Sequence, residues 1–407
     1  MSTPPTPEEK AALSVVERLR GLGHEAYWAG GCVRDRILGR AASDVDVATS
    51  AHPEAVQRAF KRTIPTGVQF GVIRVLHQGV ITEVATFRVD AEYEDGRRPT
   101  AVRFTGPEED AKRRDFTVNG LFWDPLEERV HDFVGGVQDI ARGVIRAIGD
   151  PDARFDEDKL RILRAPRFAA ALGFVLDPAT AEAARRRARE VAVVSAERIH
   201  DELVKILKRP TRARGVALCR ELGLVDALLP EAAPGVDRAV RALELLAPEA
   251  PLELAWAVLL AEAPPPRVDA ALRRLKASNQ ERELAVALCA ALPLARTFAE
   301  RPVAEQKRLL RRPEWSLVPE LLRVTALAGE GDLEPHRYLA ARRAAWAADP
   351  SPAAPTAPPL VKGSDLQAAG MRPGPAFGRI LAAVEEAQLE GRVTTREAAL
   401  ALALSLA

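Results

Sequence analysis

The sequence predicts an α+β N-terminal domain built around a small mixed sheet, followed by a long all-α region. Strand-like segments concentrate before residue 150, whereas the chain after Asp150-Pro151 is rich in Ala, Leu, Arg and Glu with helical periodicity. A Pro- and Ala-rich stretch at 349–359 then separates a final helical module, because its prolines exclude both helix and sheet.

The N-terminal elements follow one another closely. Thr6-Pro7-Glu8-Glu9 is typical of a helix start, with Thr as the N-cap, and apolar spacing continues this helix to Gly21 and Gly23. A strand at 26–29 is expected to lead through Gly30-Gly31 into a helix at 33–38. Further strands are expected at 43–47, 68–76 and 80–88. The final module is expected to contain helices at 376–390 and 395–406.

Length and composition describe a folded chain of several domains. It has 407 residues, of which 47% are hydrophobic and 28% charged, so wholesale disorder is excluded. The net charge is +1, so any surface that binds a polyanion must come from local arrangement of charge. Three separated cysteines exclude a disulfide framework, and no disulfide-linked partner is expected. No signal peptide or membrane-spanning run is evident, which predicts a cytoplasmic location and no membrane partner.

Asp44 and Asp46 form the main candidate site. Two residues apart on an expected strand, both carboxylates leave the same face, roughly 6–7 Å apart at Cα, while Val45 and Val47 face the core. Two acids on one face repel each other unless a cation lies between them, so the pair is a candidate Mg²⁺ site for a nucleoside triphosphate. Taken alone, such a pattern is more often a solvated turn.

The Gly30-Gly31 turn, shortly before this pair, strengthens the interpretation. Glycines let the backbone approach a ligand closely, and the start of the following helix offers unpaired N–H groups to phosphate. Arg34, one turn into the helix, adds a charged donor. The turn and the acids together favour a phosphate-and-metal site.

Residues 30–35 (GGCVRD) followed by Asp44-Val45-Asp46 resemble the nucleotidyltransferase head of class II tRNA CCA-adding enzymes and bacterial poly(A) polymerases. The likeness continues in order through 86–88 (TFR), 93–99 (YEDGRRP), 113–119 (RRDFTVN), 157–167, 197–198, 272–283, 362–378 and 389–400. It therefore covers nearly the whole chain.

The resemblance implies a domain order and a set of functional residues. The implied parts are a polymerase beta-like nucleotidyltransferase head at 1–150, a helical neck for nucleotide-base recognition at 151–212, a helical body at 213–348, a Pro/Ala linker at 349–360 and a helical RNA-binding tail at 361–407. The implied catalytic residues, for two-metal nucleotidyl transfer with Mg²⁺, are Asp44, Asp46 and, as a third carboxylate, Glu83; the first two are the metal ligands. The implied nucleotide-binding residues are Gly30, Gly31, Arg34, Arg113, Arg114, Asp115, Asn119, Asp158, Arg161, Arg164 and Arg167. Among these, Arg113, Arg114, Asp115 and Asn119 are expected at the start of a helix, holding the triphosphate and the ribose hydroxyls.

Asp158, Arg161, Arg164 and Arg167 recur every three residues and predict one polar face on a helix over 156–168. Without the upstream motifs this pattern would indicate an amphipathic helix with ion pairs along it. By resemblance, Asp158 and Arg161 serve as a protein template, because a carboxylate accepts from an exocyclic amine and a guanidinium donates to a ring nitrogen or carbonyl. ATP and CTP present this pattern, whereas UTP and GTP place a carbonyl where the amine would be.

Two features depart from the family's pattern. Pro166 is expected to kink the helix just before Arg167. Many bacterial relatives carry a metal-dependent HD phosphohydrolase domain in the middle region, but here no histidine lies between residues 201 and 335. Arg238 and Ala261-Glu262 stand where such relatives have metal ligands. Without imidazoles a phosphohydrolase metal centre cannot be assembled, so the body is expected to be a degenerate, catalytically inactive HD-like domain.

The expected function is template-independent addition of the 3′-terminal CCA to tRNA from CTP and ATP. A poly(A) polymerase and an A-only-adding tRNA nucleotidyltransferase of the same family remain alternatives. A non-catalytic RNA-binding scaffold is disfavoured because both Asp44 and Asp46 are present. The arginines expected to contact RNA phosphates on helical surfaces are Arg185, Arg186, Arg187, Arg189, Arg212 and Arg214.

Overall fold

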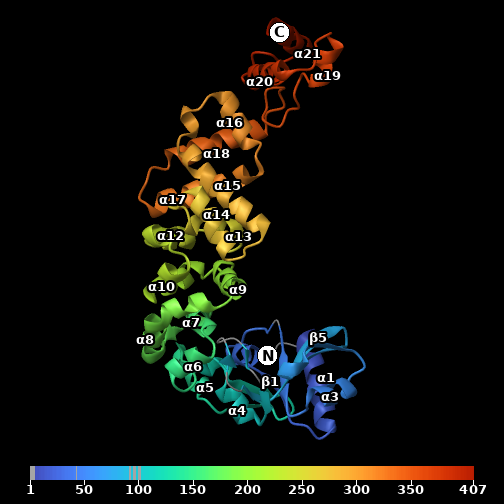
Figure 1. The fold of residues 1–407 in the computed structure, drawn as a ribbon, viewed down its shortest axis with the longest axis vertical. Helices are drawn as coiled ribbons and strands as arrows, with labels where there is room; N and C mark the ends of the chain where they lie inside the picture. Colours follow the sequence, from blue (N-terminus) through green and yellow to red (C-terminus); the bar gives the residue numbers. More distant parts are fainter. Residues whose placement is uncertain (1–4, 43, 91–92, 95–97, 100–101) are drawn as a thin grey trace. The chain divides into compact units, whose positions relative to one another are not determined.

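The computed structural model describes residues 5–42, 44–90, 93–94, 98–99 and 102–407, and it confirms the predicted fold class. A mixed sheet dominates the N-terminal part, and helices follow (Figure 1). The chain divides into two compact units, one formed by Met1–Ile206 with Arg214–Leu228 and the other by Leu207–Ala213 with Leu229–Ala407.

One seven-stranded sheet organises the first unit. Its strands are β1 (Ala26–Ala29), β2 (Asp46–Thr49), β3 (Thr63–Gly67), β4 (Val72–His77), β5 (Val80–Thr86), β10 (Leu121–Asp124) and β11 (Arg129–Asp132). They lie in the order β11-β10-β1-β2-β5-β4-β3, and only the β2–β5 pair is parallel. Three small ladders join β6 (Arg88–Asp90) to β9 (Val102–Phe104), β7 (Tyr93–Glu94) to β8 (Arg98–Pro99), and β12 (Val144–Ile145) to β13 (Val175–Leu176).

Helices make up most of the remaining structure. Those that begin in the first unit or at its border are α1 (Pro7–Gly21), α2 (Gly31–Ile37), α3 (Pro53–Ala59), α4 (Pro107–Lys112), α5 (Gly136–Arg142), α6 (Pro151–Glu157), α7 (Leu160–Leu172), α8 (Pro178–Arg187), α9 (Ala196–Leu207), α10 (Arg212–Glu221) and α11 (Leu224–Leu228). The second unit contains α12 (Val236–Glu244), α13 (Leu252–Leu259), α14 (Pro265–Arg274), α15 (Asn279–Arg296), α16 (Val303–Leu310), α17 (Val318–Ala328), α18 (Glu334–Ala347), α19 (Gly363–Ala368), α20 (Pro375–Leu389) and α21 (Arg396–Ser405). The 3₁₀ turns are η1 (Val68–Phe70), η2 (Thr117–Asn119), η3 (Ala188–Val193), η4 (Ala233–Gly235), η5 (Phe298–Glu300) and η6 (Pro313–Ser316). None of the described helices is both long and apolar enough to cross a membrane.

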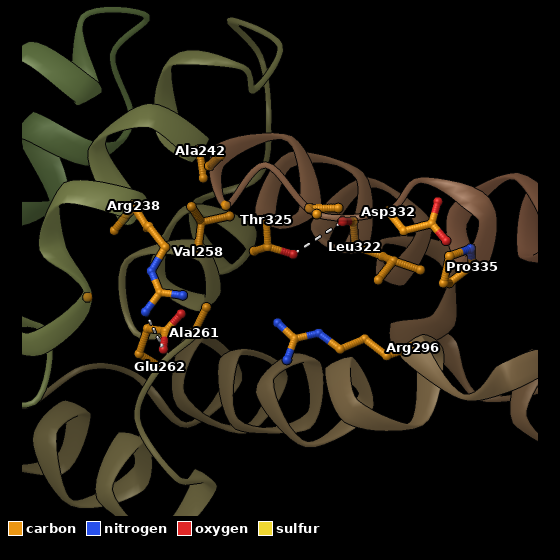
Figure 2. Close-up of a pocket in the computed structure, with 16 residues that line it drawn as sticks. Arg238, Ala242, Val258, Ala261, Glu262, Arg296, Leu322, Thr325, Asp332 and Pro335 are labelled. Carbon is orange, nitrogen blue, oxygen red and sulfur yellow. Dashed lines mark hydrogen bonds and ion pairs between the residues drawn. The ribbon is translucent and has the colours of Figure 1, made fainter.

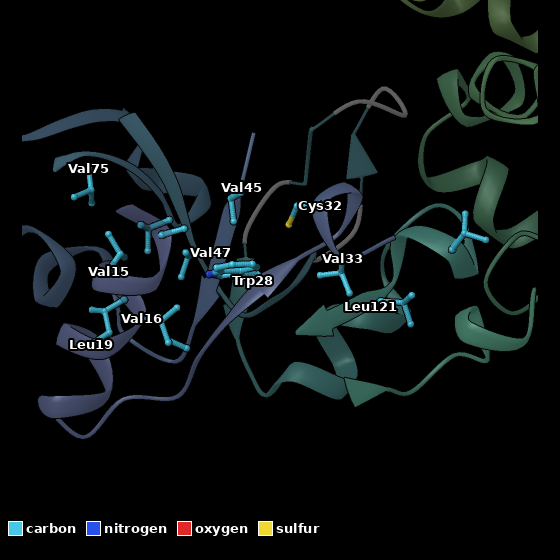
Figure 3. Packing of buried hydrophobic residues seen from close by; sticks show 14 of the residues in the cluster. Val15, Val16, Leu19, Trp28, Cys32, Val33, Val45, Val47, Val75 and Leu121 are labelled. Carbon is cyan, nitrogen blue, oxygen red and sulfur yellow. The ribbon is translucent and has the colours of Figure 1, made fainter. Parts of the chain in front are cut away.

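Helix α1 begins where the sequence predicts. The Thr6 hydroxyl accepts from the Glu9 N–H at 3.2 Å, and the Glu9 carboxylate accepts from the Thr6 N–H at 3.0 Å. This capping box satisfies two backbone donors that a helix start otherwise leaves unpaired. The apolar stripe of the helix, with Val15, Val16 and Leu19, packs into the main core (Figure 3).

Strand β1 is buried on both faces. On one face Trp28 packs with Val47 of β2 and the α1 stripe (Figure 3). On the other face Tyr27 packs against Phe87 and Phe122, with ring centroids 6.1 and 6.3 Å away. Because alternate side chains of a strand point to opposite faces, this double burial fixes the register of the neighbouring strand β2 and hence the direction of Asp46.

Some predicted boundaries are wrong. Strand β2 begins at Asp46, so Asp44 precedes the strand; Ser43, the first residue of the predicted strand, lies outside the described residues. Strand β4 begins at Val72, because 68–70 form a 3₁₀ turn and Gly71 adopts a positive φ of 77°. In the 93–99 motif, residues 95–97 lie outside the described part of the chain.

The single helix predicted over 156–168 is two helices. Helix α6 ends at Glu157, Asp158 is extended with φ −147° and ψ 103°, and α7 begins at Leu160. The three-residue spacing therefore describes one helical face only from Arg161 onward. Helix α7 continues through Pro166 and ends at Leu172, before Gly173.

The predicted Pro/Ala linker contains neither helix nor strand but is packed within the second unit. Lys307 of α16 is buried, and its ammonium donates to the carbonyls of Ala353 at 2.7 Å and Leu389 at 2.8 Å. Gln388 of α20, also buried, donates to the carbonyls of Pro352 at 2.8 Å and Pro358 at 2.9 Å. These bonds replace the helix or sheet pairing that the prolines prevent, so the stretch is an ordered connection.

Candidate nucleotide and metal site

The acidic pair lies at the start of β2. Val45 and Val47 are buried in the core, and Asp44 and Asp46 are exposed. Because Val47 pairs with Val84 in the parallel β2–β5 ladder, Asp46 and Glu83 occupy neighbouring register positions one step earlier. Three carboxylates thus come from adjacent parts of two strands and the loop before β2.

Burial and nearby negative charges make the Asp46 carboxyl group a weaker acid than usual, with a raised pKa. Desolvation and the negative charges of Glu83 and Asp44 raise the pKa of Asp46 from 3.8 to about 6, although the positive charge of Arg114 opposes them. A carboxylate held at such a cost is typical of a site completed by a cation.

Carboxylate oxygens are the donors that Mg²⁺ prefers, so the chemistry of these residues fits a divalent metal. Within the described residues, no group of three or more His, Cys, Asp or Glu side chains is gathered closely enough to hold a metal ion. Mg²⁺ commonly takes one or two carboxylates and completes its shell with water and substrate phosphates. The pair therefore fits a cation that arrives with a triphosphate.

Gly30 joins β1 to α2 in a conformation that favours glycine. Its φ is 74°, and a Cβ at this position would lie 2.9 Å from Nη1 of Arg114. The Gly30 N–H donates to the carbonyl of Leu121 at 3.0 Å, which ties the turn to β10. Only a residue without a side chain lets the turn and the Arg114 guanidinium approach this closely without strain.

The RRD motif does not begin a helix as predicted; Arg113 and Arg114 follow the end of α4. Asp110 of α4, which is buried, holds both arginines: Nη2 of Arg113 lies 2.7 Å from Oδ1, and Nη2 of Arg114 lies 3.0 Å from Oδ2. Burial opposes ionisation of Asp110, but the two arginines prevail and lower its pKa below the ordinary value. One carboxylate thus fixes the direction of two guanidinium groups.

A second chain of hydrogen bonds connects α2, η2 and α7. Nη1 of Arg34 donates to Oδ1 of Asn119 at 2.6 Å, and Nδ2 of Asn119 donates to Oδ1 of Asp115 at 3.1 Å. Nε of Arg164 donates to Oδ2 of Asp115 at 2.8 Å. Burial would raise the pKa of Asp115, but Arg164 and the hydrogen bond from Asn119 lower it, so the carboxylate is ionised at neutral pH.

The interruption between α6 and α7 places Asp158 on a bend. Its Oδ2 accepts from Nη2 of Arg198 at 2.7 Å, and its Oδ1 accepts from the Leu160 N–H at 3.1 Å. Arg161 is buried, with Nη1 donating to Oε2 of Glu157 at 2.7 Å and Nη2 donating to the Arg113 carbonyl at 2.9 Å. Both side chains are therefore held in fixed positions by partners on three segments.

These groups surround one cavity of about 380 Å³ within the first unit. The residues that line it are Gly30, Gly31, Arg34, Asp46, Arg113, Arg114, Asp115, Asn119, Asp158, Arg161, Arg164 and Phe168. The predicted residues Asp44, Glu83 and Arg167 are not among them. The lining carries three acids, Asp46, Asp115 and Asp158, and five arginines, an arrangement suited to a polyphosphate and its cation.

Arg167 does not line the cavity. It is buried, it forms an ion pair with Glu202 of α9, and its guanidinium lies 3.8 Å from the centroid of the Phe168 ring. The structure thus places Arg167 in the contact between α7 and α9.

Comparison with known proteins identifies the family. Residues 26–146 match the poly A polymerase head domain, and residues 173–235 match the probable RNA and SrmB-binding site of polymerase A. The CCA-adding enzyme of Limosilactobacillus fermentum is 34% identical over 396 residues, which cover 95% of this chain and 94% of that protein. The chain belongs to the CCA-adding enzyme family. This membership confirms the resemblance seen in the sequence.

Other members of the CCA-adding enzyme family align over a shorter part of the chain or at lower sequence identity. The Geobacillus stearothermophilus enzyme is 44% identical over 225 residues, so the chain spans 55% of that relative's length. The crystal structure of the Bacillus stearothermophilus CCA-adding enzyme in complex with CTP has 31% identity and a TM-score of 0.76, with 98% of both chains covered. The Thermotoga maritima CCA-adding enzyme complexed with tRNA has 18% identity and a TM-score of 0.67, a likeness of fold.

The sequence did not identify three residues of this candidate site. The role of Asp110 could have been predicted, because Asp110 stands three and four residues before the two arginines, the spacing of helical ion pairs. Arg198 belongs to the 197–198 motif, but its ion pair with Asp158 joins α9 to the bend after α6, and the sequence does not indicate that these two segments meet. Phe168, whose ring lies 5.6 Å from the Arg34 guanidinium and 5.3 Å from that of Arg164, gave no signal beyond its aromatic character.

The arginines expected to contact RNA are largely engaged within the protein. Arg212 has an exposed fraction of 1% and donates to the Ala247 carbonyl at 2.9 Å, so its prediction as an RNA-contacting surface residue is wrong. Arg214 donates to the Phe174 carbonyl at 2.7 Å, and Arg186 pairs with Asp152 at 2.7 Å. The sequence alone does not indicate that carbonyl and carboxylate groups of other segments accept hydrogen bonds from these guanidinium groups.

Proposed function

We propose that this chain is an ATP(CTP):tRNA nucleotidyltransferase that builds the 3′-terminal CCA without a nucleic-acid template. The observation that carries the proposal is one cavity that combines Asp46, a set of arginines and the fixed Asp158 side chain. It is supported by the names of the relatives, which are CCA-adding enzymes, and by the solved relative in complex with CTP.

Asp44 and Asp46 are the residues that would hold Mg²⁺, with Glu83 adding negative charge from β5. When bound, the metal would make the RNA 3′-hydroxyl more acidic and neutralise charge on the departing pyrophosphate. The chain's own part is positioning: β2 aims the carboxylates, and the buried Val45 and Val47 keep the strand in place.

The arginines would hold the triphosphate. Arg113 and Arg114 share Asp110 as a partner, which fixes both guanidinium groups at the cavity lining. Arg34 is steadied by Asn119, whose amide and the neighbouring Asp115 are suited to ribose hydroxyls because they offer both donor and acceptor groups. Held before the substrate arrives, these groups need little reorganisation during the reaction.

Base selection would fall to Asp158 and Arg161. A carboxylate accepts from the exocyclic amine of A or C, and a guanidinium donates to the neighbouring ring nitrogen or carbonyl. Each side chain is fixed by the contacts described above, so neither can turn to suit the carbonyl that U or G would present. A wrong base would place its carbonyl against the Asp158 carboxylate, two acceptors with no proton between them, and this mismatch enforces selection.

The test uses tRNAs that end before the first C, after one C, after CC and after CCA, each with CTP, ATP or both. The proposal predicts that both nucleotides are incorporated and that growth stops at CCA. Continued addition of A to unrelated RNA 3′ ends would establish a poly(A) polymerase. Addition of A alone, only to tRNA that ends in CC, would establish an A-adding enzyme.

A further inference from the structure

A second cavity, of about 350 Å³, lies in the helical second unit, apart from the machinery of nucleotide addition (Figure 2). It is enclosed by α12, α13, the end of α15, α17 and the turn before α18. Its apolar lining is made of Ala239, Ala242, Val258, Ala261, Leu322, Ala326 and Ala328. The volume is within the range of small-molecule sites, and much of the wall is apolar.

One acidic group at the cavity is already neutralised. Oε2 of Glu262 lies 3.2 Å from Nη2 of Arg238, and Figure 2 shows this pair on one side of the cavity. Glu262 packs directly on Gly235: a Cβ there would lie 2.2 Å from Cγ of Glu262. Gly235 thus provides the space in which Glu262 meets Arg238.

Arg296 is the charged side chain of this cavity that lacks a partner among the described residues. It ends α15, is exposed, and directs its guanidinium into the middle of the cavity (Figure 2). The other acid of the lining, Asp332, is occupied in capping, because its Oδ1 accepts from the Glu334 N–H at 2.8 Å. The cavity therefore offers one uncommitted guanidinium above an apolar floor.

We propose that this cavity binds a small organic anion, with its carboxylate or phosphate on Arg296 and its apolar portion against Val258, Leu322 and the alanines. A guanidinium presents paired N–H groups whose geometry matches either anion. The lining contains no His or Cys, so a transition metal is a poor alternative occupant. The helical body, which the sequence predicted to be a catalytically inactive HD-like domain, would then bind a small molecule.

The test measures binding of phenyl phosphate, benzoate and inorganic phosphate to the full-length protein by calorimetry. Wild type, Arg296→Ala, Glu262→Gln and Arg337→Ala are compared. Arg337 is the matched control, since it is an arginine of the same unit that is exposed, pairs with Glu334 and lies outside the cavity lining. Thermal unfolding of each variant checks that Arg296→Ala, which loses no internal hydrogen bond, remains folded.

The expected result is that phenyl phosphate or benzoate binds more tightly than inorganic phosphate, because only the first two use the apolar floor. Which of the two binds more tightly distinguishes phosphate from carboxylate. Arg296→Ala should weaken binding roughly 10- to 100-fold, the range for a lost hydrogen-bonded charge. Glu262→Gln should strengthen binding by removing a negative charge, and Arg337→Ala should leave it within about twofold.

Two outcomes would overturn the proposal. In one, neither aromatic anion binds, or binding is equal in wild type and Arg296→Ala. In the other, Arg296→Ala lowers tRNA affinity without affecting either anion, which would make the guanidinium an RNA backbone contact. Neither outcome bears on nucleotide addition in the first unit, so failure of this proposal leaves the proposed function intact.

Discussion

Replacing Asp46 by Asn tests the metal site through stability, without an enzymatic assay. The folded protein raises the pKa of Asp46 from 3.8 to about 6. A carboxyl group whose pKa is higher in the folded than in the unfolded state destabilises the fold once it ionises. The cost is therefore absent below about pH 4, grows between pH 4 and 6, and is fully present above pH 6.

The size of this cost follows from the shift. Two pKa units correspond to about 3 kcal/mol, but Asp46 is exposed, and solvent screening reduces the expected cost to about 1 kcal/mol. Asp46→Asn should then raise the free energy of unfolding by about 1 kcal/mol at pH 8 and leave it unchanged at pH 4. For a domain of this size the gain corresponds to a rise in Tm of about 2–4 °C.

Calorimetric unfolding with EDTA, at pH 4 and pH 8, measures the difference, and repetition with Mg²⁺ tests the metal. Mg²⁺ should stabilise wild type at pH 8 and stabilise Asp46→Asn much less, because the variant has lost one ligand. Glu17→Gln is the control: it removes an exposed carboxylate of α1 that is not part of the cavity lining. A variant that is less stable than wild type at pH 8, or that gains equally from Mg²⁺, would refute the reasoning.

Three further predictions concern activity and selectivity. Gly30→Ala should lower kcat/KM at least tenfold, because a methyl group there meets the Arg114 guanidinium and strains a positive φ. Asp158→Ala should lose discrimination against UTP while keeping the stabilisation by Mg²⁺, measured by competition between CTP and UTP. Arg167→Ala should destabilise the protein by about 1.5–3 kcal/mol, because buried Glu202 loses one of its two ion-pair partners and keeps only Lys205, yet leave the KM for nucleotide within about threefold.

The first of these variants has a matched control in the same chain. Gly79→Ala matches Gly30→Ala, since Gly79 has a φ of 80° but a Cβ there meets nothing within 4 Å; equal losses of activity in both would contradict the role of the Arg114 contact. For Asp158, unchanged selectivity against UTP would remove the protein-template argument. For Arg167, a large rise in nucleotide KM without loss of stability would instead assign it to the nucleotide.

Local signals predicted several elements well. The capping box of α1, the Gly30-Gly31 turn and the two long tail helices were visible because each depends on residues close together in the sequence. The sequence also predicted the acidic pair and the arginines of the cavity, because motifs that resemble those of the family occur in the same order along the chain.

What the sequence did not reveal depends on contacts across segments. The bend at Asp158 is stabilised by Arg198, forty residues away, and the residues near Asp158 do not predict this ion pair. The ordering of the Pro/Ala stretch depends on Lys307 and Gln388, from helices on either side of it in the chain. The burial of Arg212 depends in the same way on carbonyls of another segment. In each case a buried polar group found its partner through tertiary packing, which periodicity does not encode.

The measurement that tests the account most directly is the initial rate of nucleotide incorporation into tRNA lacking its terminal CCA by a double variant, Asp44→Asn with Asp46→Asn. The account predicts a loss of at least about 1,000-fold, with nucleotide still bound by the arginines of the cavity, because the charge needed to hold the metal is gone. Incorporation at the wild-type rate would show that these carboxylates do not serve the reaction.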